Sequence, residues 1–251
     1  IEIDKEGYKL LSDLAYQKKD YIRAIKFLQK RLELGERNVN IHYNIGGNAS
    51  IIAKRNKNFK GIKYVEIAKY HFKKALELKE NHIPSLVALA KLYIQLPNFL
   101  GGTDFKGRMY SNKLLKYDLI EGNLMNGFIF EINKNFDSAK EKYEKAFEIF
   151  KKKYSCDQSL FKSNSLRKNM LFELAEVSVR FNIHLDLSIC LLKKFISKYN
   201  EEIFPKEWIY LRLAELYYKS GDKSKTKYYL NESLKINPNF NQARVFKQNI
   251  Y

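Results

Sequence analysis

The sequence predicts an all-α fold built from antiparallel helix pairs. Apolar residues recur through most of the chain at the i, i+3, i+4 and i+7 spacing of one helix face. Only 11 Gly and 4 Pro occur among the 251 residues, so few β-type turns are available. Several segments also share one phase of small and aromatic residues, which indicates an internal repeat.

The segment 207–240 shows the repeat most clearly. Tyr210, Leu213 and Tyr217 fall on one helix face, Gly221 breaks that helix, and Pro238 stops a second one. This segment resembles the tetratricopeptide (TPR) repeat, a helix pair of about 34 residues with the pattern W-x2-L-G-x2-Y, A-x3-F and P. The resemblance implies helices A and B in each repeat and pairs that stack into a right-handed superhelix.

The same phase places further helix pairs along the chain. Small residues at Ala24, Ala75 and Ala139 are expected where helices A and B approach closely. In the second repeat, helix B comes late, and we expect residues 54–63 to form a basic insertion between its helices. We predict a single TPR-like domain over 1–251, about six pairs and a cap, at 1–36, 39–80, 83–118, 120–153, 165–200, 207–240 and 241–251. The alternative is a non-repeating helical bundle.

The resemblance implies a binding module. Other TPR proteins hold peptides or partner helices on a concave surface lined by helix A, so we expect a protein–protein interaction scaffold. We expect Tyr43 and Phe128 to be aromatic anchors there, although such rings can instead belong to the core between repeats. The family's groove positions fall on Tyr16, Tyr43, Ile51, Val87, Lys91, Ile94, Leu124, Phe128 and Tyr218.

Residues 95–118 carry a second, local resemblance. Pro97, Leu100, Gly101, Gly102 and Lys106 match a P-x(n)-L-G-G-[ST]-x-x-K-A segment of TPR proteins associated with TRAP-type periplasmic transporters. This implies an alternative function, as an accessory component of a periplasmic solute-binding transport system. A structural interpretation is also available, because a Gly-Gly pair turns the chain where a positive φ is needed.

Location is predicted from the same resemblance and from the chain start. No run of about 18 apolar residues occurs, so no transmembrane segment is expected. The sequence begins at Ile1 rather than Met, and we expect a tag boundary or a targeting or membrane-anchor segment upstream of it. Together these points favour the bacterial cell envelope or periplasm over the cytoplasm.

The net charge of +18 raises the question of an anionic partner. Of the 46 basic residues 9 are arginine and 37 are lysine, and arginine is the better reader of phosphates and bases. A solvated lysine-rich surface is therefore favoured, and a nucleic-acid-binding helical repeat is kept as a further alternative. A protein or peptide is the expected partner.

No catalytic, metal or cofactor pattern is present in the sequence. The cysteines, Cys156 and Cys190, have no metal-ligand spacing, and we expect both to be ordinary thiols. The histidines form no HExxH pair. We therefore expect a protein that is not an enzyme and that uses no cofactor.

Overall fold

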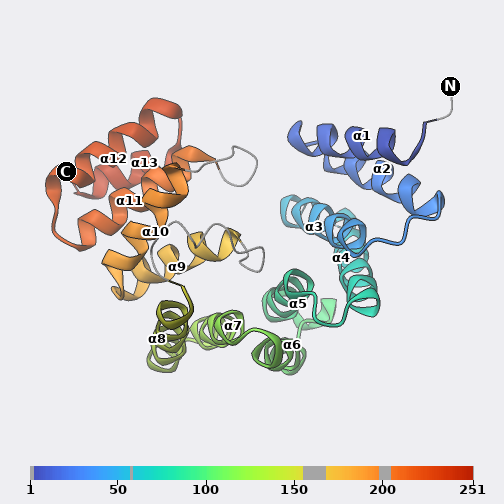
Figure 1. Cartoon of the computed structure of the whole chain (residues 1–251), viewed down its shortest axis with the longest axis horizontal. Coiled ribbons are helices and arrows are strands. Elements are labelled where there is room, and N and C mark those ends of the chain that lie inside the picture. The colour runs from blue at the N-terminus through green and yellow to red at the C-terminus, as the bar shows by residue number, and fades with distance from the viewer. Residues whose placement is uncertain (1–2, 57–58, 155–167, 198–204, 251) are drawn as a thin grey trace. The chain divides into compact units, whose positions relative to one another are not determined.

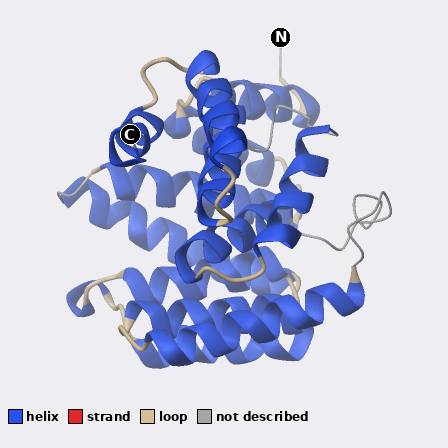
Figure 2. Cartoon of the chain, turned by 90° about the vertical axis from the view of Figure 1, so that its left-hand side faces the viewer, coloured by secondary structure: helices blue, strands red, loops and turns tan. Residues whose placement is uncertain are grey.

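A computed structural model describes residues 3–56, 59–154, 168–197 and 205–250 (Figure 1). In these ranges the regular elements are 13 α-helices and one short 3-10 helix, and no strand is present (Figure 2). The prediction of an all-α fold made of consecutive helix pairs is confirmed.

The chain divides into two compact units, Ile1–Lys142 and Tyr143–Tyr251. The boundary between the units falls inside α8 (Phe136–Lys153). The helices before α8 are α1 (Lys5–Gln17), α2 (Tyr21–Glu33), α3 (Val39–Arg55), α4 (Phe59–Leu78), α5 (Ile83–Gln95), η1 (Asn98–Leu100), α6 (Asp104–Tyr117) and α7 (Leu119–Ile132). Those after it are α9 (Lys168–Phe181), α10 (Leu185–Ser197), α11 (Lys206–Lys219), α12 (Lys223–Ile236) and α13 (Asn241–Ile250).

Acidic side chains define several helix starts. Asp4, Asp20, Asp118 and Asp222 each precede a helix and accept a hydrogen bond from a backbone N–H of its first turn. Such a cap satisfies a donor that has no partner within the helix, and its loss costs about 1 kcal/mol. The helix boundaries are therefore encoded locally.

The turns between paired helices share one backbone feature. Four turns each contain a residue with a positive φ: Lys19 between α1 and α2, Lys134 between α7 and α8, Asn182 between α9 and α10, and Gly221 between α11 and α12. Their φ angles are +58°, +60°, +53° and +84° respectively. A left-handed residue at the same place in four turns supports a common repeat phase for these pairs.

Small residues bring the paired helices together. Ala24, Ala75 and Ala139 are 0% exposed, which confirms their predicted burial. Gly46 packs so closely on the ring of Phe72 that a Cβ atom at residue 46 would lie 2.7 Å from it. The contact between α3 and α4 therefore requires a residue without a side chain.

Most described residues of the predicted insertion at 54–63 lie in helices. α3 continues to Arg55 and α4 already begins at Phe59, so most of the extra residues lengthen the two helices. Gly61 allows the start of α4 to approach the end of α3, since a Cβ atom there would lie 1.8 Å from the Asn56 carbonyl oxygen. Apart from Asn56, the described residues of the predicted insertion therefore belong to the two helices.

The prediction of an ordinary thiol at Cys190 was also wrong. Cys190 in α10 is disulfide-bonded. The sequence has one other cysteine, Cys156, which lies outside the described residues. Pairing depends on the approach of two Cα atoms to about 5.5–6 Å, and sequence spacing does not reveal that approach.

Candidate functional site

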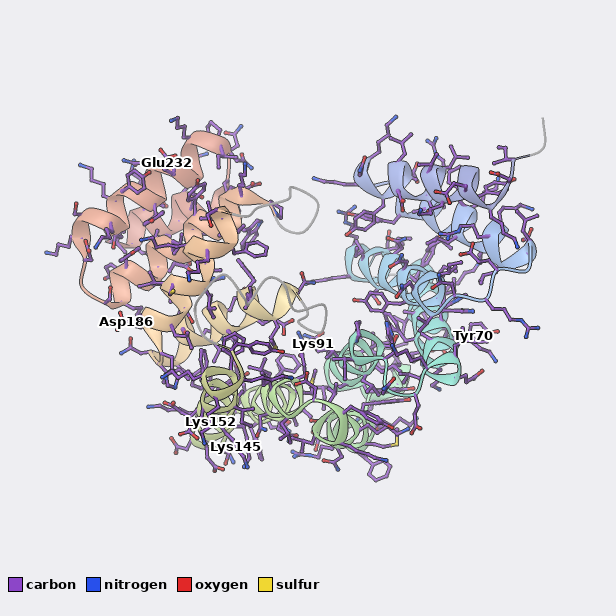
Figure 3. All side chains as sticks on the ribbon, in the orientation of Figure 1. Tyr70, Lys91, Lys145, Lys152, Asp186 and Glu232 are labelled. Atoms are coloured by element: carbon purple, nitrogen blue, oxygen red, sulfur yellow. The ribbon has the colours of Figure 1, made fainter. Side chains whose placement is uncertain are left out.

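The helix A residues of the first unit form the candidate site. α3 contacts α5, and α5 contacts α7, so these three helices are consecutive neighbours. Lys91 projects from α5 (Figure 3), and its Nζ atom lies 5.8 Å from the ring centroid of Phe128 in α7. A cation over an aromatic ring at this distance contributes about 0.5–1 kcal/mol at an exposed site. Two of the predicted residues are thus brought together from separate helices.

Three other predicted residues belong mainly to the packing between helices. Val87 in α5 and Leu124 in α7 are each 6% exposed, which leaves little surface for a partner. Ile94 packs on α6, where a Cβ atom at Gly107 would lie 2.3 Å from its Cδ1 atom.

Tyr43 is partly buried against the core of the first unit. Its ring centroid lies 5.9 Å from that of Phe72 in α4 and 5.5 Å from that of His82 before α5. His82 in turn shares a hydrogen bond of 2.8 Å with the Ser85 hydroxyl. Tyr43 therefore fits the core interpretation of the aromatic residues better than the anchor interpretation.

The remaining predicted residues are more open. Tyr16 is 51% exposed and meets Tyr21 edge-on at 5.8 Å, while the guanidinium of Arg55 lies 4.8 Å above the Tyr21 ring. Ile51 is half-buried on α3. Tyr218 is 47% exposed but lies in the second unit, where it contacts Phe246 of α13.

The Gly-Gly turn at residues 101–102 has a structural explanation. Gly101 has a φ of +80°, as the structural interpretation requires. A Cβ atom at Gly102 would lie 1.8 Å from the Leu96 carbonyl oxygen, and the Thr103 hydroxyl caps α6 by accepting from the Lys106 N–H. The motif therefore builds the connection from α5 to α6.

Two histidines meet between α3 and α4. The Nδ1 atoms of His42 and His71 lie 2.9 Å apart. Burial, with His42 as a lesser cause, lowers the pKa of His71 to about 4. Burial, helped by the nearby Lys74, also lowers the pKa of His42. Both rings are therefore neutral at pH 7, with one donating to the other.

The second unit holds a partly buried ion-pair network that the sequence did not indicate. Arg212 in α11 bonds to Glu176 in α9 at 2.9 Å and to Glu215 one turn further along α11. Its guanidinium also lies 5.4 Å from the ring centroid of Phe172. Burial raises the pKa of Glu215 although Arg212 opposes that shift. The network joins two consecutive A helices.

The sequence also did not indicate a set of polar contacts that links three residues of the second unit. His184, in the turn before α10, has its Nε2 atom 2.6 Å from Glu144 and its Nδ1 atom 2.8 Å from the Lys151 ammonium. Its ring stacks on Phe147 at 4.6 Å. No sequence motif could have revealed this chain, because α8 and the turn are far apart in the sequence.

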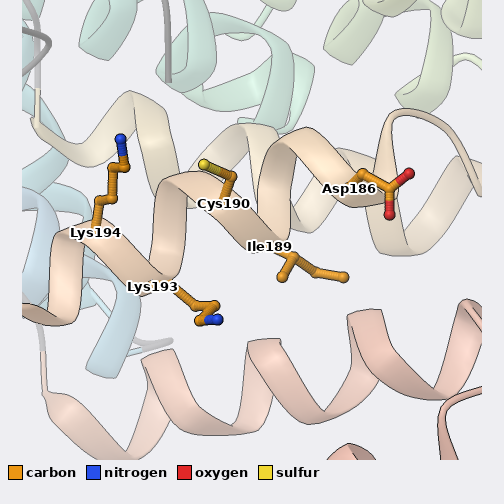
Figure 4. Close-up of a pocket in the computed structure, with 5 residues that line it drawn as sticks. All are labelled: Asp186, Ile189, Cys190, Lys193 and Lys194. Atoms are coloured by element: carbon orange, nitrogen blue, oxygen red, sulfur yellow. The ribbon is translucent and has the colours of Figure 1, made fainter. Parts of the chain in front are cut away.

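The described residues give little further indication of a small-molecule or metal site. A pocket of about 350 Å³ beside α10 is lined by Asp186, Ile189, Cys190, Lys193 and Lys194, all from that helix (Figure 4). Among the described residues, no group of three or more His, Cys, Asp and Glu side chains is arranged to hold a metal ion. In the same residues, no helix combines the length and apolar character that a membrane span needs.

Comparison with protein families identifies the repeat. Residues 209–240 match the family model of the tetratricopeptide repeat. The chain contains a tetratricopeptide repeat. The matched residues cover nearly all of the segment 207–240, in α11 and α12, and the TPR resemblance predicted from the sequence is confirmed. No curated protein sequence matches the chain significantly.

Solved structures show the TPR fold over most of the chain. A tetratricopeptide repeat protein from Parabacteroides merdae is 13% identical, with a TM-score of 0.51 over 95% of this chain and 82% of that one. The human IFIT1 dimer with PPP-AAAA is 19% identical, with a TM-score of 0.53 over 92% of this chain and 47% of that one. These likenesses concern the fold alone. The TPR fold suggests a protein–protein interaction scaffold.

Proposed function

We propose that this chain is a scaffold that holds a segment of a partner protein against α3, α5 and α7. The contact between Lys91 and Phe128 supports this proposal most directly, because the repeat phase selected both residues and they meet across two A helices. The ring offers apolar surface and the ammonium offers a charge. The pair suits a partner segment with an apolar side chain next to a carboxylate.

Gly47 is a second observation in favour of a binding surface that includes α3. A Cβ atom at Gly47 would have no heavy atom within 4 Å, so the backbone of α3 is open there. An approaching chain can therefore come closer to α3 at this point than a side chain would permit.

Photocrosslinking tests the proposal. A benzophenone amino acid replaces Phe128 in cells, and the crosslinked partner segment is identified by mass spectrometry and then synthesised. We expect Phe128→Ala to weaken its binding by about 30-fold, which corresponds to ~2 kcal/mol. Lys91→Glu should weaken it as well without removing apolar packing. The control is Phe105→Ala, because Phe105 on α6 is 78% exposed and outside the face.

Two outcomes would contradict the proposal. Binding that is unchanged in Phe128→Ala and Lys91→Glu would place the partner elsewhere. Binding that is lost equally in Phe105→Ala would show that the effect is not specific to the face.

The alternatives predicted from the sequence lead to different partners. A crosslinked solute-binding protein would support the accessory transport function and a place in the cell envelope. Binding of a labelled oligonucleotide that falls steeply with salt would instead support a nucleic-acid partner for this basic chain, since phosphate contacts release counterions.

A further inference from the structure

Lys151 differs from its neighbours in the lysine run that ends α8. Residues 151, 152 and 153 are all lysines, all exposed, and all in the last turn of the helix. Lys151 shares a helix face with Glu144 and Phe147, at the i, i+3 and i+7 positions. Its Nζ atom lies 2.8 Å from Nδ1 of His184. The neighbouring Lys152, labelled on α8 in Figure 3, points from a different face of the helix.

The imidazole of His184 is held on both sides. A lysine ammonium can only donate a hydrogen bond, and a carboxylate can only accept one. The contacts therefore assign Nδ1 as the acceptor from Lys151 and Nε2–H as the donor to Glu144, at 2.8 Å and 2.6 Å. The ring is only 17% exposed on its side chain and stacks on Phe147. A fixed base thus faces the lysine, with a carboxylate behind the base.

The backbone of His184 is in a rarely populated conformation. Its φ is +48°, a left-handed value that a residue with a Cβ atom adopts at a cost of about 1–2 kcal/mol. The contacts with α8 hold the ring in place despite that cost. Such strain accompanies functional positions in many proteins.

We propose that Lys151 is a site of covalent acylation by small acyl phosphates. His184 accepts a proton from the ammonium, and Glu144 stabilises the resulting imidazolium. The amine nitrogen then attacks the carbonyl carbon, a carbon–nitrogen bond forms, and the bond from that carbon to the phosphate oxygen breaks. The ammonium gives up two protons in total, one through His184 to solvent before the attack and one to the departing phosphate, and no group is oxidised or reduced.

The lysine run favours an anionic acyl donor over a neutral ester. Lys152 and Lys153 add two further positive charges to the same helix turn, and this local positive charge attracts the phosphate group. The same residues are internal controls. Both are exposed lysines like Lys151, but among the described residues it is Lys151 that contacts Nδ1 of His184.

The test uses the purified full chain and acetyl phosphate. Initial acetylation rates at Lys151, Lys152 and Lys153 are measured by mass spectrometry with fragmentation that separates the three sites. Because a positioned general base contributes about 10²–10⁴ in rate, we expect Lys151 to react at least about tenfold faster than Lys152. Equal rates at the three lysines in the unmodified chain would overturn the proposal.

Two variants test whether the imidazole of His184, rather than solvent exposure alone, sets the acetylation rate of Lys151. His184→Asn removes the base but keeps a residue that tolerates a left-handed backbone, and should bring the Lys151 rate down to the Lys152 rate. Glu144→Gln keeps an acceptor for Nε2–H without the charge, and should lower the Lys151 rate partly. The Lys152 rate should stay constant in both variants. A ratio of Lys151 to Lys152 that neither variant changes would overturn the assignment of His184 as the base.

Discussion

Two adjacent glycines in α3 allow a matched test of how the helix pairs pack. A Cβ atom at Gly46 would lie 2.7 Å from two carbons of the Phe72 ring, whereas one at Gly47 would meet nothing within 4 Å. Gly47→Ala should stabilise the chain by about 1 kcal/mol, because alanine is the better helix former. Gly46→Ala has the same helix gain but overpacks a ring that is 2% exposed, at a cost of about 1–3 kcal/mol.

The two variants should therefore differ by about 1–3 kcal/mol in the free energy of unfolding, since the helix gain is common to both. Urea unfolding followed by far-UV circular dichroism measures this difference. Adding Phe72→Leu to Gly46→Ala should recover part of the loss, because the smaller side chain relieves the overpacking. Equal unfolding free energies for the two alanine variants, or a more stable Gly46→Ala, would refute the close packing of α3 on α4.

Three further predictions concern other parts of the chain. Ala24→Leu should lower the free energy of unfolding by about 1–3 kcal/mol, and an unchanged thermal midpoint would contradict the repeat phase. The folded-state pKa of His71 is lowered to about 4 from 6.5. Its neutral form therefore stabilises the fold above pH 6.5, and this stabilisation should be lost as the pH falls from 6.5 to 4. The free energy of unfolding should therefore fall over that pH range, and His71→Gln should flatten the measured pH profile there. Thiol titration of the denatured, unreduced chain should find no reactive cysteine at Cys190, and a labelled Cys190 would show that the disulfide is absent.

The fold could be predicted from the sequence because its determinants are local. Helix caps such as Asp20 and Asp222, the turn at Gly221 and the small residue Ala24 act within one helix pair. Each of these features has a short sequence signature. The end of α3 at Arg55 and the start of α4 at Phe59 were harder to predict, because residues 54–63 have the polar composition of a loop.

The candidate site could be predicted only in part. Repeat phase fixes the helix and the approximate direction of a side chain, and it selected Lys91 and Phe128, whose side chains meet in the structure. It does not fix how far a neighbouring helix covers the same position. Tyr43 meets both Phe72 and His82, and Val87 is 6% exposed, because adjacent pairs close over them. Such coverage depends on long-range packing, which a single-repeat pattern does not contain.

The lysines at the end of α8 also show that sequence alone does not predict the surroundings of a single side chain. Successive helix positions are rotated by about 100°, so three chemically identical neighbours face three directions. Only Lys151 shares the face of Glu144 and Phe147, and only there does the left-handed turn at His184 bring an imidazole within 2.8 Å. Sequence presents the three lysines as one charged run. The folded chain distinguishes them by the groups that converge on each nitrogen, and a difference in reactivity between Lys151 and Lys152 would be a direct measure of that convergence.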